Sequence, residues 1–165
     1  MILVGEIRDD DTALTAMRSA ESGHLVLCTM HTNDAGETMQ RLIDLFPSRH
    51  QALARQMLAS TLIGTVSQRL VPATDGHRRL NAEVLVNSIR IRDMIIEGRP
   101  PSDFHEAIAE GDYYGMQTFD QDLLAHVRAG RVGVEEAIAW STNAHDFKLM
   151  LSGNAPVRTQ RASAA

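Results

Sequence analysis

The sequence is poor in cysteine, long apolar runs and positive charge. Cys28 is the only cysteine among 165 residues, which excludes an internal disulfide and favours a reducing compartment. No stretch reaches the roughly 18 apolar residues of a membrane-spanning helix, so direct membrane insertion is not expected. Sixteen Lys and Arg face 21 Asp and Glu, for a net charge of −5. This balance argues against nucleic acid or an anionic membrane surface as the main partner, and the expected location is the cytoplasm.

Three motifs of nucleotide binding and acyl transfer are also missing. The sequence has no Gly-x-x-x-x-Gly-Lys-Ser/Thr loop, no Gly-x-Gly-x-x-Gly and no Gly-x-Ser-x-Gly. The chain therefore has no readable motif that could cradle a triphosphate. A nucleotide site in it would have only part of its components.

What is present indicates a folded, helix-rich domain or a fragment of a larger protein. Hydrophobic residues make up 44% of the chain and charged residues 22%. Both the length and these proportions allow a substantial core.

The beginning of the chain predicts a strand, a helix and a second strand. Ile2–Val4 is a short apolar run typical of a strand buried on both faces. Residues 9–12 supply a helix start, and residues 24–30 supply the second strand. About 20 residues separate the strands, which predicts a parallel pair with a right-handed crossover. Ligands bind at the carboxyl ends of such strands, where Glu6 and His31 would then share one crevice.

The remainder of the chain predicts a hairpin and a series of helices. The hairpin comprises residues 67–71 and 79–86, with Asp75-Gly76 as its turn. Helical patterns cover residues 34–46, 49–66, 89–97, 103–110, 119–129, 134–140 and 144–150. The predicted fold class is therefore α/β, with parallel strands and a hairpin followed by an all-helical part. The tail from residue 152 has little to bury and is predicted to be disordered.

Glu6 and His31 are the first candidates for chemistry. A carboxylate at the end of a buried strand can polarise a water for attack on a phosphate. The alternative is an ordinary ion pair with Arg8 or a cap on the next helix. His31 is placed to sense a terminal phosphate beside Glu6, although a loop histidine is more often solvated or capping.

A metal site built from His24, Cys28 and His31 is not expected. On a strand, His24 and Cys28 share a face but lie about 13 Å apart, which is too far for one ion. A fourth ligand is also absent. Cys28 is expected in the core, and His24 is expected to be structural or to face a neighbouring subunit.

Several segments resemble the ATPases of type II and type IV secretion. I-L-V-G-E-I-R-D resembles their Walker B segment, and G-H-L-V-L-C-T-M-H-T-N-D-A resembles their His box. The similarity continues through M-L-A-S-T-L-I-G-T-V-S-Q-R-L-V, A-E-V-L-V-N-S and Y-Y-G-M-Q-T-F-D-Q-D-L-L, and it covers about residues 1–151. The resemblance is greatest to the twitching-motility retraction ATPases of type IV pili (PilT-like). Assembly motors usually carry zinc-binding cysteine pairs after the position of Val71, and this chain has none.

The resemblance implies a RecA-like (P-loop NTPase) fold and a set of site residues. Glu6 corresponds to the Walker B glutamate, and His24 and His31 correspond to the His-box histidines. The possible supporting residues are Gly5, Arg8, Thr29 and Thr32. Residues 90–97 correspond to a helix tied to retraction, in which the matching positions are Ile91, Arg92, Ile95 and Glu97. Ile96 replaces a basic residue of that helix.

The resemblance also implies a domain order. Residues 1–87 would be the carboxyl-terminal part of the RecA-like core, residues 88–151 a helical subdomain, and residues 152–165 a disordered tail. Members of the family carry a PAS-like domain, the phosphate-binding loop and an Asp box before this point. The chain is therefore expected to be the carboxyl-terminal half of a motor.

The implied function is ATP hydrolysis, with Mg²⁺, in a ring of six like subunits that drives pilus retraction. The implied partner is an inner-membrane pilus platform protein, and the implied location is the cytoplasm at the periphery of that membrane. The isolated chain is expected to be inactive and to bind neither ATP nor Mg²⁺ strongly. The alternatives are another type II secretion or DNA-uptake ATPase, or a non-enzymatic truncated paralogue that binds motor subunits.

Overall fold

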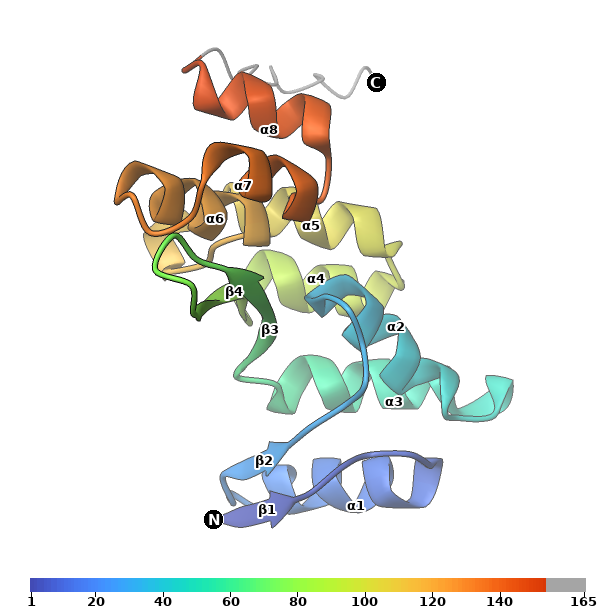
Figure 1. The fold of residues 1–165 in the computed structure, drawn as a ribbon. Helices are drawn as coiled ribbons and strands as arrows, with labels where there is room; N and C mark the ends of the chain where they lie inside the picture. The colour runs from blue at the N-terminus through green and yellow to red at the C-terminus, as the bar shows by residue number, and fades with distance from the viewer. Residues whose placement is uncertain (154–165) are drawn as a thin grey trace, which may run out of the picture. The chain divides into compact units, whose positions relative to one another are not determined.

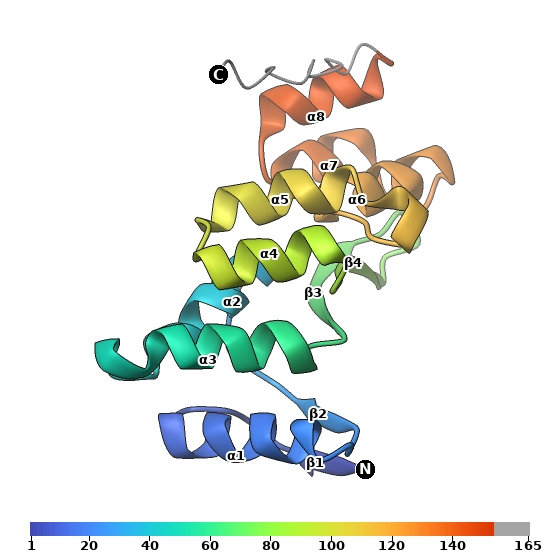
Figure 2. The same ribbon diagram turned by 180° about the vertical axis from the view of Figure 1, so that it is seen from behind.

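The computed structural model describes residues 1–153 and confirms the α/β class. Figure 1 and Figure 2 show the elements from two opposite sides. The strands are β1 (Ile2–Val4), β2 (Val26–Cys28), β3 (Gly64–Pro72) and β4 (Arg78–Val86). The helices are α1 (Asp10–Glu21), α2 (Ala35–Asp44), α3 (Ser48–Thr61), α4 (Ile89–Glu97), α5 (Pro101–Ala109), the 3₁₀ helix η1 (Asp112–Tyr114), α6 (Phe119–Arg128), α7 (Val134–Trp140) and α8 (Ala144–Leu151). The predicted disordered tail lies outside the described residues, apart from its first two.

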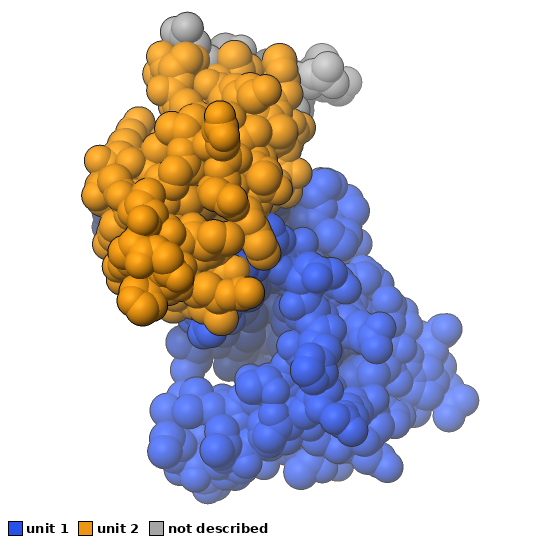
Figure 3. Space-filling model, viewed as in Figure 1, with its two compact units in different colours: residues 1–69, 82–118 blue, residues 70–81, 119–165 orange. Residues whose placement is uncertain are grey.

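The chain forms two compact units, which Figure 3 colours separately. Unit 1 contains Met1–Arg69 and Ala82–Thr118, and unit 2 contains Leu70–Asn81 and the described residues from Phe119 onward. This division differs from the predicted boundary between residues 87 and 88. The physical reason is that α4 and α5 bury their apolar faces against α3 and α2, and so belong to unit 1.

The strands β1 and β2 form the predicted parallel pair, in which Ile2 lies opposite Val26 and Val4 opposite Cys28. The Asp9 side chain accepts a hydrogen bond from the backbone N–H of Thr12 and so begins α1 as predicted.

The expectation that β1 is buried on both faces was wrong. Leu3 is 76% exposed and Leu27 is 47% exposed, whereas Val4 and Val26 pack against the core. The expectation that Cys28 lies in the core was also wrong, because this cysteine is exposed. Leu3 and Leu27 lie on the face of this two-stranded sheet that the core of unit 1 does not cover, whereas Cys28 is exposed at the last position of β2.

The core of unit 1 lies among five helices. Packing contacts join α3 to α1, α2 and α4, and join α5 to α2 and α4. In both views α3, α4 and α5 form successive layers. Gly36 lies where α2 meets α5, and a Cβ atom at this position would come within 2.7 Å of the Pro101 carbonyl oxygen. The absence of a side chain therefore permits the close approach of the two helices.

The helix α3 ends earlier than predicted, at Thr61 in place of residue 66. Asn87, which follows β4, donates from Nδ2 to the carbonyl oxygens of Ala59 and Leu62. These bonds satisfy carbonyl groups at the end of the helix, and the chain then enters β3 at Gly64.

Unit 2 is built from the hairpin tip and α6, α7 and α8. Its apolar core contains Val71, Leu123, Leu124, Val132, Ala137 and Phe147. Two buried polar contacts accompany it. The His126 Nε2 atom lies 2.8 Å from the Leu80 carbonyl oxygen, and Asp120 accepts a 2.8 Å hydrogen bond from the Thr142 N–H. The hairpin turn contains Gly76 at φ 80°, which agrees with the predicted turn.

Within residues 1–153, none of the helices combines the length and hydrophobicity that crossing a bilayer requires.

Candidate functional site

The candidate site lies where β1 and β2 end, at the same edge of the parallel pair. Two hydrogen bonds extend the pairing past the strands. Thr29 donates from Oγ1 to the Gly5 carbonyl oxygen at 2.5 Å, and the Ile7 N–H donates to the Thr29 carbonyl oxygen at 3.0 Å. These bonds bring Glu6 beside the segment that carries His31.

Glu6 has a partner on each carboxylate oxygen. Its Oε1 atom lies 3.3 Å from Nε2 of His31, and its Oε2 atom accepts from Nε of Arg8 at 2.6 Å. The side chain of Glu6 is only 20% exposed, whereas that of His31 is 89% exposed. The carboxylate of Glu6 is thus largely buried, whereas both of its partners, Arg8 and His31, are exposed to solvent.

The surroundings of Glu6 favour its ionised form. The hydrogen bond from Arg8 is the largest influence and lowers the pKa of Glu6, and the charges of Arg8 and His31 act in the same direction. Partial loss of hydration opposes them. The same pairing raises the pKa of Arg8. Glu6 is therefore a carboxylate at neutral pH, the form that can orient a water and accept its proton.

The segment after β2 is fixed to α2 by polar contacts. The hydroxyl oxygens of Thr32 and Thr38 lie 2.6 Å apart. Asn33 donates to Oε2 of Glu37 from both its backbone N–H, at 2.9 Å, and its side-chain amide, at 2.8 Å. The backbone N–H of Glu37 in turn donates to the Asp34 side chain. Sequence reasoning missed this arrangement, although an acidic residue followed three positions later by Glu is a recognised helix-start signal.

A second contact that the sequence reasoning missed comes from β4. The Oε1 atom of Glu83 accepts a 2.9 Å hydrogen bond from the backbone N–H of Ala35, the first residue of α2. Glu83 is 2% exposed, and this burial raises its pKa. It lies in the segment A-E-V-L-V-N-S, to which the sequence analysis gave no role.

His24 is not part of this group. It precedes β2, whereas His31 follows it, and its Nδ1 atom lies 2.9 Å from the Ser22 hydroxyl. In the described part of the chain, no three His, Cys, Asp or Glu side chains come together in a way that could hold a metal ion. The structure therefore gives no support to a metal site that includes Cys28.

The helix matched to the retraction motif is α4, and its four matching residues have different environments. Ile91 and Ile95 are buried in the core of unit 1. Arg92 donates from Nε to the Ala59 carbonyl oxygen at 3.1 Å. Glu97 accepts a 2.7 Å hydrogen bond from Arg99 and is about half exposed. Of the four, Arg92 and Glu97 are exposed at the surface of the helix.

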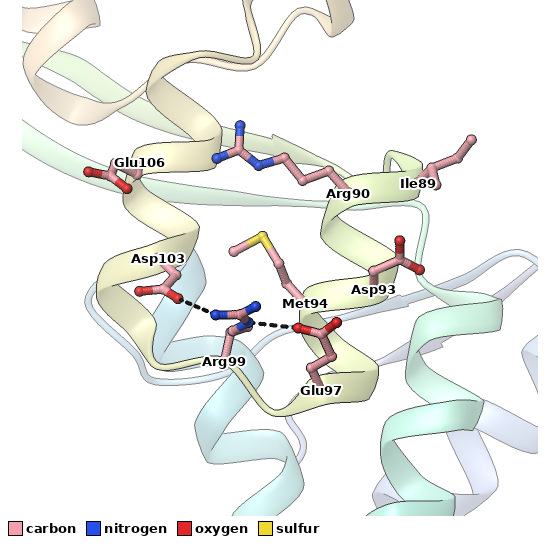
Figure 4. A pocket seen from close by; sticks show the side chains of 8 residues that line it. All are labelled: Ile89, Arg90, Asp93, Met94, Glu97, Arg99, Asp103 and Glu106. Atoms are coloured by element: carbon pink, nitrogen blue, oxygen red, sulfur yellow. Dashed lines mark hydrogen bonds and ion pairs between the residues drawn. The ribbon is translucent and has the colours of Figure 1, made fainter. Parts of the chain in front are cut away.

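A hollow on unit 1 lies between α4 and α5 (Figure 4). Its lining residues are Ile89, Arg90, Asp93, Met94, Glu97, Arg99, Asp103 and Glu106. Figure 4 shows Arg99 between Glu97 and Asp103, and the ion pair to Asp103 measures 3.8 Å. The hollow includes none of the residues around Glu6.

Comparison with known proteins defines the family. The model of the family described as "Type II/IV secretion system protein" matches residues 1–149. The chain belongs to this family. Within the family, it is 38% identical over 138 residues to a protein of Neisseria gonorrhoeae named "Twitching motility protein". It is also 38% identical over 137 residues to the "Type IV pilus retractation ATPase PilT" of Pseudomonas aeruginosa.

Each alignment with these two family members covers 83% of this chain. A solved structure of the family, "Crystal Structure of the Pilus Retraction Motor PilT and Bound ADP", matches 87% of the chain with a TM-score of 0.74 and 36% identity. The chain spans only 37% to 40% of the length of these relatives. It thus corresponds to part of a type II/IV secretion system protein of the PilT kind, as the resemblance implied.

Proposed function

We propose that the chain is the carboxyl-terminal portion of an ATPase motor that drives retraction of a type IV pilus, and that Glu6 acts on the attacking water. The observation that carries the proposal is the ionised Glu6 carboxylate held 3.3 Å from His31. It lies at the carboxyl edge of a parallel sheet, where such folds bind ligands.

The residues present fit part of an ATP site. Bound ATP would supply the phosphoryl group, and Mg²⁺ would neutralise charge on the phosphates. Glu6 would orient a water and accept its proton, while an N–H of His31 would contact an anionic oxygen. Arg8 would keep Glu6 ionised. Positioning of the triphosphate must come from outside residues 1–165, since the chain contains no phosphate-binding loop motif, and the chain alone would not turn over ATP.

The proposal includes partners and location. The motor would be a six-membered ring of like subunits in the cytoplasm, acting on the inner-membrane platform of the pilus. The exposed apolar side chains of Leu3 and Leu27 support association with further protein, since a surface of this kind is stabilised when another surface covers it. Type II secretion proteins are also among the relatives, so the assignment to retraction rests on the more similar proteins named above.

A chimaera tests the proposal. Residues 1–149 would replace the matched part of the Pseudomonas aeruginosa PilT protein, and ATP hydrolysis would be measured with and without Glu6→Gln. The expected result is an active chimaera that loses roughly 10²- to 10⁴-fold in kcat upon Glu6→Gln, the usual contribution of a general base. Glu21→Gln, the same chemical change at an exposed position of α1, is the control and should retain activity.

Two results would overturn the proposal. One is an active chimaera whose kcat is unchanged by Glu6→Gln. The other is a chimaera that assembles with like subunits but does not hydrolyse ATP, which would favour a non-enzymatic paralogue that binds motor subunits.

A further inference from the structure

Glu83 is a buried carboxylate with no part in the chemistry described above. It is 2% exposed and lies on β4. Its Oε1 atom accepts a 2.9 Å hydrogen bond from the backbone N–H of Ala35, which is 48 positions away along the chain. An ionisable group buried without a partner is costly, so its hydrogen bond to α2 deserves an explanation.

The contact satisfies both of its members. The first N–H groups of a helix have no partner within the helix, and the positive end of the helix dipole favours an anion there. Glu83 supplies a carboxyl oxygen to this end of α2 from a different element of unit 1. The nearby charge of Asp34 opposes ionisation of Glu83, whereas those of His105 and Arg69 favour it.

The amino terminus of α2 in turn holds the segment that carries His31. Asn33 and Thr32 contact side chains in the first turn of α2, at Glu37 and Thr38. At its other end the segment is tied to β1, because Thr29 bonds to the residues on either side of Glu6. The His31 segment is therefore held between two anchors, and Glu83 fixes one of them.

We propose that Glu83 is a positioning residue for the nucleotide site: by fixing the amino terminus of α2 it holds His31 next to Glu6. The inference rests on the proposed function, which gives the pair of Glu6 and His31 its role. Glu83 itself touches none of the reacting groups and acts only through the α2 backbone.

Amide hydrogen exchange of the 165-residue chain, followed by NMR, tests this role. Glu83→Leu removes the acceptor, whereas Glu83→Gln retains an oxygen that can accept from Ala35. We expect Glu83→Leu to accelerate exchange at the Thr32 and Asn33 amides by about tenfold, because the buried N–H of Ala35 loses its acceptor. The nuclear Overhauser effect between the ring protons of His31 and the side-chain protons of Glu6 should weaken in parallel. Glu83→Gln should restore both signals to within about twofold of the native values.

Asp120 offers a matched control. It is also a buried carboxylate that accepts a backbone N–H, that of Thr142 at 2.8 Å, but it belongs to unit 2. Asp120→Leu should accelerate exchange in unit 2 and leave the Thr32 and Asn33 amides unchanged. A purely general loss of stability would instead raise exchange alike in both variants.

Unchanged exchange at Thr32 and Asn33 in Glu83→Leu, or no rescue by Glu83→Gln, would overturn the proposal. If Glu83→Leu does not fold, Ala35→Pro supplies a second test, since it removes the donor, and its ring adds two carbon atoms at a buried position. Proline is favoured at the first position of a helix, and Asp34 already has the extended backbone that precedes a proline, with φ −152° and ψ 175°. Faster exchange at Thr32 and Asn33 in Ala35→Pro would support the proposal, and native exchange would overturn it.

These measurements use no nucleotide. A failed positioning test would leave the chimaera result intact, and an inactive chimaera would leave the exchange result intact. The two proposals can therefore fail separately.

Discussion

Glu6 and His31 face each other across the ends of two parallel strands, with Oε1 and Nε2 3.3 Å apart. The two residues are brought together because β1 and β2 run in register, with Val4 opposite Cys28. The hydrogen bond from Thr29 to Gly5 continues that register to the site. The proximity of the carboxylate and the imidazole is thus a consequence of strand pairing and can be tested through the titration of Glu6.

Removal of Arg8 should raise the pKa of Glu6. The pairing lowers the folded-state pKa of Glu6, so its stabilising contribution is present above the unfolded-state pKa and is lost as pH falls through the folded-state pKa. Arg8→Gln should move the carboxyl titration, followed by ¹³C NMR, upward toward the ordinary range. Arg18→Gln, on the exposed face of α1, should leave it unmoved. An unaltered titration in Arg8→Gln would show that the ion pair does not control this carboxylate.

Glu83 should make stability decline as pH rises. Burial raises its folded-state pKa above the ordinary value of about 4.5, so its contribution is complete below that value and is lost as pH rises through the raised pKa. Glu83→Gln cannot ionise, and its free energy of unfolding should vary less with pH above 4.5. Urea unfolding at a series of pH values measures this, with Glu21→Gln as the control. Identical slopes in the native chain and Glu83→Gln would contradict the expectation.

Gly36→Ala should destabilise unit 1. The new Cβ atom would come within 2.7 Å of the Pro101 carbonyl oxygen, so α2 and α5 would have to separate. The expected loss is about 1–3 kcal/mol in the free energy of unfolding, as for other overpacked contacts, and thermal denaturation followed by circular dichroism would detect it. Gly5→Ala serves as the control, because no atom lies within 4 Å of a Cβ placed there. Equal melting temperatures for the two variants would refute the close-approach argument.

Arg92→Met should lower stability more than Arg90→Met. Arg92 donates to the Ala59 carbonyl oxygen near the end of α3, and loss of this bond should cost about 1 kcal/mol. Arg90 forms an ion pair with Glu110 in which both side chains are more than half exposed, and such pairs contribute little. Chemical denaturation of the two variants compares them directly. The reverse order would contradict the role given to the Arg92 bond in the α3–α4 contact.

Local signals in the sequence predicted much of the fold. The helix predicted over residues 89–97 is α4 with the same bounds, and that over residues 134–140 is α7. The Asp9 cap and the Gly76 turn also follow from near neighbours in the chain. In each of these cases the deciding interactions lie within a few residues, so a sequence pattern can express them.

Features that depend on distant residues were not predictable in this way. The contact of Glu83 with Ala35 joins positions 48 apart, and neither residue carries a signal of it. The exposure of Leu3 and Leu27 depends on which face of the β1–β2 sheet is covered, whereas an apolar run alone predicts burial on both faces. The site was predicted in part: Glu6 and His31 are side by side, and the bonds of Thr29 lie within the two motifs, but Glu37, Thr38 and Glu83, which hold the His31 segment and α2, lie outside them.

The burial of Ile91 and Ile95 alters how sequence differences on α4 should be interpreted. A change at either position alters the interior of unit 1, so selection for folding alone is enough to restrict it. Ile89, Asp93 and Ile96 lie on the outside of the same helix, where a change can alter what the helix meets without disturbing the core. A change at these outer positions, Ile96 among them, can therefore alter a binding surface of the helix without altering the core.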